Sequence, residues 1–314
     1  MKQIFLSQVG QLVEKETFEP GVWVNLVNPS QRELEEVANH YQIDLDDLRA
    51  PLDAEERSRI MTEEAYNVIL VDVPISQDRS GKVYYITIPL GILLTKDAII
   101  TTCLEALPLF DHFINNRERR FSTFMQTRFV FQILYHNTQR YLSALRVIDR
   151  KSDQIERTMH ESTQNEELID LMEMEKTIVY FKASLKMNER IVKKLALSST
   201  ILPKYEEDEE LLEETLVETQ QAIEMADIYG SIINSMTSAY ASVINNNQNT
   251  IMKTLALVTT VLSIPTMIFS AYGMNFKNND LPFNAVSHAF WWVILVAFGL
   301  SVSLTIYFIR KKWF

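Results

Sequence analysis

The sequence predicts an α/β domain at the N-terminus, followed by a long helical stalk and two C-terminal transmembrane helices. Runs of β-branched and aromatic residues, which favour strands, are concentrated in residues 1–105. No glycine occurs between Gly91 and Gly230, and glycine breaks helices, so long helices are expected there. Near the end of the chain, two stretches of 18 and 21 residues contain no Asp, Glu, Lys, Arg or His. Each is long enough to cross a hydrocarbon core, which takes about 20 residues.

Residues 1–105 are expected to form the cytosolic α/β domain. Its predicted strands are GVWVNLV, YNVILVDV, VYYITIPLGILL and AIITTC, at residues 21–27, 66–73, 83–94 and 98–103. SQDRSGK, at residues 76–82, would be the hairpin loop between the second and third of them. No glycine-rich phosphate loop follows any of these strands, so a nucleotide partner is not expected.

Two short helices are expected in the same domain. Ser30 and Glu33 form a capping-box pattern, which predicts a helix that runs through about His40. A second helix is expected over Asp44–Ala50.

Residues 106–205 are expected to form a cytosolic hairpin of two long helices that pack and carry no chemistry. Apolar residues recur there at three- and four-residue steps, as on one face of a helix. They are Leu134, Tyr141, Leu145, Ile148, Ile155 and Met159, with Thr138 and Ser152 in the gaps. A turn at Glu161–Glu167 would precede the second helix, from about Leu168 to Leu197.

Residues 206–271 are expected to form one stalk helix that continues into the first transmembrane helix, at about 254–271. A helical apolar stripe runs from Leu212 to Val243, and the first proline is Pro265. A helix from about Glu209 to Ala271 would be about 90 Å long at ~1.5 Å per residue. Such a rod suits a stalk that enters a membrane.

The basic residues predict the orientation of the two spans. Lys253 precedes the first span, and a basic tail at 310–314 follows the second span, at 289–309. The loop between them, 272–288, has Lys277 as its one Lys or Arg. By the positive-inside rule, both termini of this multi-pass cell-membrane protein face the cytoplasm and the loop is external. A buried helical hairpin is the alternative.

The composition restricts the partners. The chain has 41 acidic and 30 basic residues and a net charge of −11, which argues against nucleic acid. An acidic chain fits a protein that meets cations, although it is equally typical of soluble proteins. No nucleophile–base pair or metal cluster supports catalysis, so an enzyme is not expected.

A small and polar stripe distinguishes the first span from the second. Thr259, Ser263, Thr266 and Ser270 follow steps of four, three and four residues, and the same rhythm extends back to Ala256, Met252 and Asn249. Two interpretations compete. The small residues could let helices approach, with hydroxyls bonded to their own backbone. Alternatively, the stripe could line the axial pore of a symmetric oligomer, since two spans cannot enclose a path alone. The second span has no such stripe beyond Ser301, Ser303 and Thr305, and is expected to be the outer, lipid-facing helix.

The residues after the first span are those of a known family. Tyr272-Gly273-Met274-Asn275-Phe276, a short loop, a second span and a basic tail resemble the CorA-type divalent-cation transporters, whose signature is Gly-Met-Asn. Pro265 and the NTIMK entry at 249–253 agree with this resemblance, which is strong over about 100 C-terminal residues.

The resemblance implies a homopentamer that lies in a lipid bilayer as a funnel, with the first spans around a central pore. It implies passive transport of Mg2+, often also Co2+ and Ni2+, with no required cofactor. Gly273, Met274 and Asn275 would form the outer selectivity motif. A gate would fall on Met252 and Leu255, with Asn249 below it. The full predicted pore-lining set is Asn249, Met252, Leu255, Ala256, Thr259, Ser263, Thr266 and Ser270.

The resemblance also implies regulation by cytosolic Mg2+ bound between subunits. Glu214 lies about where the family carries a stalk carboxylate, and Asp78 is its predicted partner. The loop departs from the family pattern, because FKNNDLPF carries Lys277 and Asp280 where many members have an acidic segment. A Zn2+ transporter of the same fold is therefore the alternative, followed by a membrane-anchored scaffold.

Overall fold

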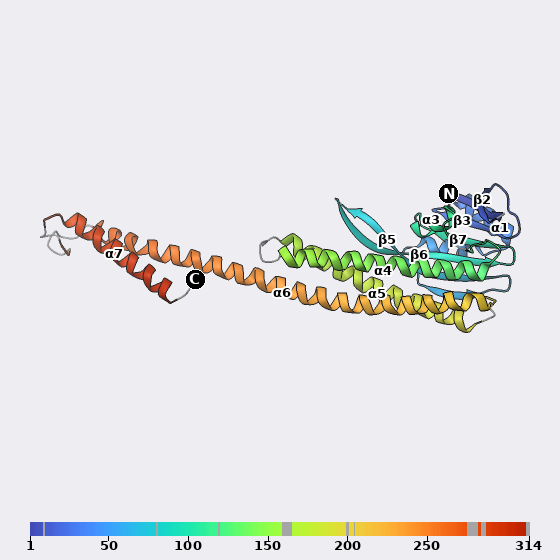
Figure 1. Cartoon of the computed structure of the whole chain (residues 1–314). Coiled ribbons are helices and arrows are strands. Elements are labelled where there is room, and N and C mark those ends of the chain that lie inside the picture. The colour runs from blue at the N-terminus through green and yellow to red at the C-terminus, as the bar shows by residue number, and fades with distance from the viewer. Residues whose placement is uncertain are drawn as a thin grey trace. The chain divides into compact units, whose positions relative to one another are not determined.

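The computed structural model describes the chain in nine segments. They are residues 1–8, 10–79, 81–118, 120–158, 165–198, 201–203, 205–274, 282–283 and 287–311. Contacts divide the chain into two compact units, Met1–Thr237 and Ser238–Phe314 (Figure 1).

A mixed sheet forms the centre of the first unit. Its seven described strands follow the order β2-β1-β3-β7-β6-β5-β4, and all neighbours are antiparallel except the parallel pair β3–β7. The strands are β1 (Lys2–Gln8), β2 (Gln11–Lys15), β3 (Val22–Val27), β4 (Arg59–Thr62), β5 (Tyr66–Arg79), β6 (Lys82–Thr95) and β7 (Ala98–Cys103). The four predicted strands are confirmed, whereas β1, β2 and β4 were not expected.

The predicted hairpin loop at 76–82 is wrong. The two strands pair continuously up to Arg79 opposite Lys82, so the connection is much shorter than seven residues. A loop was predicted because most side chains of this segment are polar. Exposed strand ends tolerate polar residues, because the ladder is held by backbone hydrogen bonds.

Two short helices cover one face of the sheet. α1 (Gln31–Tyr41) has the predicted capping box, in which the Ser30 hydroxyl accepts from the Glu33 N–H and the Glu33 carboxylate accepts from the Ser30 N–H. α2 (Leu45–Arg49) follows, with the single turn η1 (Ala50–Leu52). Their apolar faces join the alternate residues Val22, Val24 and Leu26 of β3 in one buried cluster.

Long helices cover the opposite face. α4 (Gln126–Thr158) and α5 (Asn165–Leu197) follow the short elements η2 (Pro108–Phe110) and α3 (Asp111–Ile114). Trp23, which points away from its neighbours Val22 and Val24, lies fully buried against Phe129 of α4 at a ring distance of 5.1 Å. Sheet and helices therefore share one core, and residue 105 marks a change of secondary structure within it.

The long helix α6 (Glu206–Tyr272) begins in this unit and packs on α4 and α5 (Figure 1). The Thr138 and Thr219 hydroxyls lie 3.0 Å apart, and Lys182 of α5 pairs with Asp227. The predicted apolar stripe is buried at Ile223, Ala226, Ile233 and Met236. A single helix through both the stalk and the first span is thus confirmed.

A buried ion pair fastens the beginning of α6 to α4. The Arg128 Nε donates to Asp208 Oδ1 at 2.7 Å, and the two side chains are only 8% and 7% exposed. A second guanidinium nitrogen of Arg128 donates to the Glu207 carbonyl at 2.8 Å.

Replacing Arg128 with methionine is expected to destabilise the folded chain by about 3–5 kcal/mol, because the Asp208 carboxylate is left buried without its partner. Thermal unfolding of the full chain in detergent measures this loss. The double substitution Arg128→Met with Asp208→Leu leaves no uncompensated charge, and should recover much of the stability. Equal unfolding temperatures for Arg128→Met and the unchanged chain would contradict this assignment.

In the second unit, the end of α6 packs on α7 (Ala289–Arg310). Val293, Ala297 and Ser301, one turn apart on α7, are its buried residues. Pro265 has no N–H to donate to the carbonyl of Val261, four residues earlier. The Ser301 hydroxyl donates to this carbonyl at 3.3 Å, so α7 satisfies the group that the proline leaves without its helical partner.

Candidate functional site

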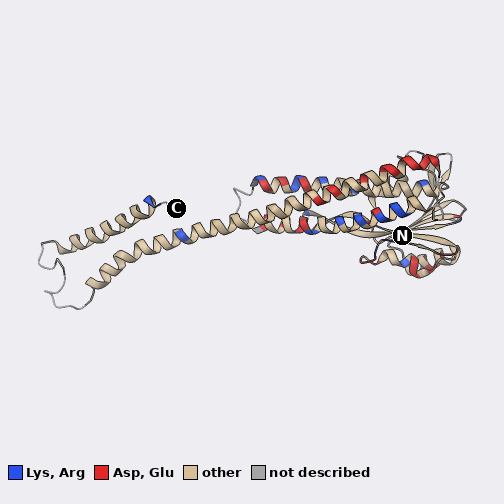
Figure 2. Cartoon of the chain, turned by 90° about the horizontal axis from the view of Figure 1, so that it is seen from below, with Lys and Arg blue, Asp and Glu red and all other residues tan. Residues whose placement is uncertain are grey.

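The C-terminal parts of α6 and α7 are apolar without being buried. Each contains an 18-residue window with high mean hydropathy, 1.7 in α6 and 2.2 in α7. None of the α6 window and only 17% of the α7 window is buried. Figure 2 shows that charged residues crowd the helices of the first unit and are nearly absent from these two segments. Since water disfavours this much exposed apolar surface, a bilayer or other copies of the chain must cover it.

The predicted stripe lies on the side of α6 that faces away from α7. Half-buried residues mark the side toward α7, and Val261 is at its centre because it accepts from Ser301. These half-buried residues are Leu257, Val261, Ile264, Pro265, Ile268 and Tyr272. At about 100° per residue, the stripe from Met252 to Ser270 lies within roughly 40° of the opposite direction. Its own chain therefore leaves the stripe uncovered.

Every residue of the predicted pore-lining set is exposed in the single chain. This holds for Asn249, Met252, Leu255, Ala256, Thr259, Ser263, Thr266 and Ser270. Between Leu262 and Met267, the short side chains of Ser263 and Thr266 leave a shallow groove in the helix surface.

Three hydroxyls of the stripe donate to the backbone of their own helix. Thr259 donates to the Leu255 carbonyl at 2.8 Å, Ser263 to the Thr260 carbonyl at 2.8 Å, and Thr266 to the Leu262 carbonyl at 2.9 Å. The backbone bonding foreseen by the packing interpretation is therefore present. Each hydroxyl oxygen still has acceptor capacity, so the same geometry presents acceptors to water on the uncovered side.

The chain ends its first span at the Gly-Met-Asn motif. Helix α6 ends at Tyr272, and the Gly273 N–H donates to the Phe269 and Ser270 carbonyls at 3.0 and 3.1 Å. Gly273 does not have a positive φ, unlike Gly10, Gly21 and Gly81, so it does not end the helix as a left-handed cap. A Cβ added at Gly273 would meet nothing nearer than 3.5 Å. The chain by itself therefore does not require glycine here.

The rest of the predicted outer mouth is described only in part. Met274 follows Gly273 and is 57% exposed. Asn275, Lys277 and Asp280 lie outside the described residues.

Glu214 lies on the exposed side of α6, close to α4. Its carboxylate accepts a hydrogen bond from the Tyr135 hydroxyl at 3.2 Å. Burial, and then the nearby Glu214 charge, raise the pKa of Tyr135 above its ordinary value. The hydroxyl thus stays protonated and available as a donor, while Glu214 keeps acceptor capacity toward solvent.

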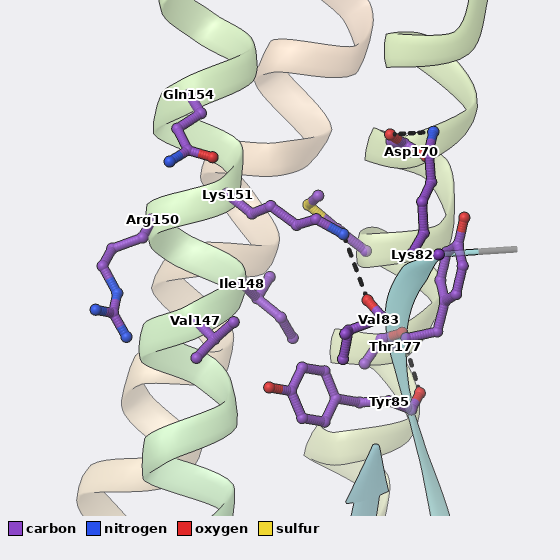
Figure 3. A pocket seen from close by; sticks show the side chains of 13 residues that line it. Lys82, Val83, Tyr85, Val147, Ile148, Arg150, Lys151, Gln154, Asp170 and Thr177 are labelled. Carbon is purple, nitrogen blue, oxygen red and sulfur yellow. Dashed lines mark hydrogen bonds and ion pairs between the residues drawn. The ribbon is translucent and has the colours of Figure 1, made fainter. Parts of the chain in front are cut away.

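Asp78 lies at the far end of the same bundle, at the tip of the β5–β6 hairpin. Its carboxylate accepts from the Gly81 N–H at 2.9 Å. The hairpin is fastened to α5 by the Lys82–Asp170 ion pair at 2.8 Å and to α4 by a bond from Lys151 to the Val83 carbonyl at 3.3 Å (Figure 3).

A single chain does not bring Glu214 and Asp78 together. Tyr135, beside Glu214, and Lys151, beside the hairpin, are separated on α4 by roughly 24 Å at 1.5 Å per residue. Within the described segments, no group of three or more His, Cys, Asp or Glu side chains could hold a metal ion. A site that uses both carboxylates needs more than one copy of the chain.

The contact between Ser301 and Val261 could not be assigned from the sequence. Ser301 was noted as one of the few polar residues in a helix expected to face lipid, yet its side chain is buried against α6. The available signal was Pro265 in one span and a small group of hydroxyl residues at mid-depth in the other, which matches a freed carbonyl with possible donors.

Comparisons with known proteins agree on one family. The family described as CorA-like Mg2+ transporter protein matches residues 19–311. The cobalt/magnesium transport protein CorA of Methanocaldococcus jannaschii is 26% identical over 301 residues, which cover 93% of this chain and 90% of that protein.

Solved structures share the fold. The complete CorA magnesium transporter from Methanocaldococcus jannaschii matches with a TM-score of 0.78 and 22% identity, over 100% of this chain and 99% of that one. The cytoplasmic domain of ZntB from Vibrio parahaemolyticus matches with a TM-score of 0.56 and 11% identity, over 78% of this chain and 97% of that one.

Proposed function

This chain belongs to the family of CorA-like Mg2+ transporter proteins, and we propose that it carries Mg2+ passively across the cell membrane through a pore formed by several copies of α6. The copies would form a homopentamer, with both chain termini in the cytoplasm. Co2+ and Ni2+ are further candidate substrates. No cofactor, nucleotide or nucleic acid is required, and we expect no enzymatic activity.

The observation that carries the proposal is the direction of the polar stripe. Thr259, Ser263 and Thr266 face away from α7, and their side chains are exposed although they lie in a membrane span. Hydroxyl groups are unfavourable against lipid, so this side of α6 needs other helices or water. Facing copies of α6 around an axis provide both.

The chemistry of the stripe suits a hydrated ion. Mg2+ gives up its water reluctantly and demands an octahedral shell. Neutral oxygen acceptors, such as the hydroxyls of α6 and the proposed ring of Asn275 amides, bind the hydrogen atoms of that water shell without holding the ion permanently. Met252 and Leu255, at 63% and 59% exposure in one chain, would form an apolar constriction that closes by dewetting.

Regulation would involve carboxylates of neighbouring copies. Abundant internal Mg2+ would bridge Glu214 of one copy and Asp78 of another, and so hold the pore closed. Scarce Mg2+ would leave these acidic surfaces to repel one another, which favours opening.

Ion flux into liposomes that contain the purified full chain tests the transport function. We expect Mg2+ to enter along its gradient with no imposed pH gradient. Flux of Zn2+ that greatly exceeds that of Mg2+ and depends on a pH gradient would instead favour the Zn2+ alternative. No flux of either ion from correctly assembled oligomers would favour a membrane-anchored scaffold.

Replacing Gly273 with alanine is expected to leave the single chain intact and to reduce Mg2+ flux strongly, by about tenfold or more if the close approach of copies at the mouth is lost. The unfolding temperature in detergent should not change, since a methyl group fits at Gly273 within one chain. A matched control is Gly299→Ala, on α7, where an added Cβ meets nothing within 4 Å. Equal flux in both variants would show that Gly273 has no role beyond its own chain.

Replacing Glu214 with lysine is expected to raise the internal Mg2+ concentration that half-inhibits flux by about fivefold or more, a usual size for coupling between sites. The neighbouring exposed residue gives the control, Glu213→Lys, which makes the same charge change one residue away. Liposomes loaded with graded Mg2+ supply the inhibition curves. Superimposable curves for the two variants would remove Glu214 from the sensor.

A further inference from the structure

A buried nitrogen of Arg140 lacks a partner in the first unit. Arg140 lies midway along α4, and its Nε is shielded from solvent with no hydrogen-bond partner in the described part of the chain. Leaving such a donor unsatisfied costs roughly 1–3 kcal/mol, and more when the group is charged. Burial lowers the pKa of Arg140 below its ordinary value, and the charge of Asp111 offsets this only in part. Arg140 as a whole is half-buried, so it is this Nε that has lost water without gaining a protein partner.

Arg140 lines a polar cavity of about 290 Å³ between α4, α3 and the β5–β6 strands. Side chains that can donate hydrogen bonds gather around it. They are Ser76, His112, His136, Gln139, Arg140 and Ser143. No carboxylate is among the lining residues that the structure describes, so the wall carries donors and a positive charge.

Two acidic residues, Glu118 and Asp111, act near this cavity, but neither forms an ion pair with Arg140 in the described structure. Glu118 accepts from Gln132 at 3.0 Å and lies 2.7 Å from the His136 Nε2. The His136 ring stacks on that of His112 at 4.6 Å. Asp111 acts on Arg140 through its charge alone, since no ion pair joins the two side chains in the described structure. Glu118 is therefore engaged with His136 and Gln132, and no carboxylate of the described residues accepts from the Arg140 Nε.

The cavity of Figure 3, which lies nearer the tip of the β5–β6 hairpin, provides a contrast. It is also lined by cations, but each of them has a protein partner. Lys82 pairs with Asp170, Lys151 donates to the Val83 carbonyl, and the Arg150 Nε donates to the Arg146 carbonyl at 3.1 Å. A cationic wall therefore does not by itself set the Arg140 cavity apart, whereas the buried Nε without a partner does.

We propose that the Arg140 cavity is a binding site for a small oxyanion of the phosphate class, in which the Arg140 guanidinium is the main donor. A planar guanidinium matches two oxygens of such an anion at once, and charge-assisted bonds of this kind are about twice as strong as neutral ones. Ser143 and Ser76, which are exposed at the rim, would donate to the remaining oxygens. This site is separate from the proposed pore and does not depend on it.

Thermal unfolding of the full chain in detergent, with inorganic phosphate exchanged for chloride at constant ionic strength, tests the proposal. A ligand that binds only the folded chain raises the unfolding temperature with its concentration. We expect phosphate to do so in the unchanged chain. Arg140→Gln should weaken the phosphate affinity by about tenfold or more, because a charge-assisted bond is lost. Broadening of the phosphorus resonance of phosphate supplies a second readout of binding.

Two further variants keep the outcome decisive. Arg146→Gln removes a cation from the exposed side of α4, outside the cavity, and should retain the phosphate effect. Ser143→Leu places a larger apolar side chain at the rim of the cavity and keeps Arg140, and should abolish the effect even if Arg140→Gln fails to fold. Parallel titrations with sulfate and acetate decide whether the tetrahedral or the carboxylate shape is preferred. The proposal is overturned if phosphate has no effect on the unchanged chain, or if Ser143→Leu responds as the unchanged chain does.

Discussion

Replacing Asn275 with alanine is expected to abolish Mg2+ flux into liposomes while the oligomer stays assembled. The proposed outer mouth consists of one Asn275 amide from each copy, and these carbonyl oxygens would accept from the water shell of the arriving ion. Alanine removes every acceptor of the ring together, so the effect multiplies with the number of copies. We expect the loss to exceed about a hundredfold, since several neutral hydrogen bonds of about 1 kcal/mol each disappear.

The same loop supplies the control. Asn278→Ala makes an identical change three residues further along, outside the Gly-Met-Asn motif, and should leave most of the flux. Chemical cross-linking of both variants checks that assembly is unchanged. Unaltered Mg2+ flux in assembled Asn275→Ala, or equal losses in the two variants, would overturn the assignment of Asn275 to the mouth.

Strands with long apolar or β-branched runs could be predicted from the sequence, but the two N-terminal strands could not. β7 has the predicted bounds, Ala98–Cys103, because all six residues are apolar or β-branched or cysteine, and all are buried. β1 has only the short apolar run Ile4-Phe5-Leu6 between polar residues, and β2 reads QLVEK, with two apolar residues in five. Their strand conformation comes from pairing with each other and with β3, and long-range pairing of this kind overrides local propensity.

The stripe of the first span could be predicted because its period is a property of one helix. What faces the stripe could not, since that depends on where α7 packs. The structure shows that α7 covers the side of Val261 and leaves Thr259 and Thr266 uncovered. Whether the stripe packs against helices or lines a pore therefore depends on how other copies of the chain face it.

Arg140 illustrates a limit of another kind. In the sequence it is one of several charged residues in a helical pattern, next to the predicted core residue Tyr141. Its buried nitrogen becomes visible only when β5, β6 and α3 surround it. The signal is the desolvation of one atom by segments distant along the chain, and no local pattern encodes that.

The double substitution Thr259→Val with Thr266→Val is expected to lower Mg2+ flux by roughly tenfold or more. Valine keeps the shape of threonine and removes only the hydroxyl, whose oxygen would accept from the water shell of the passing ion. Each lost acceptor costs about 0.5–1.5 kcal/mol, and every copy of α6 loses two. Flux into liposomes at matched protein density measures the effect.

Thr260 gives an internal control for this argument. It is also exposed, and its hydroxyl also donates to the backbone four residues earlier, at 2.8 Å from the Ala256 carbonyl. It differs from Thr259 chiefly in direction, by about 100° around the helix. Thr260→Val should therefore keep most of the flux. If the hydroxyls serve helix packing alone, the double substitution should change assembly and leave the flux of each assembled pore unaltered.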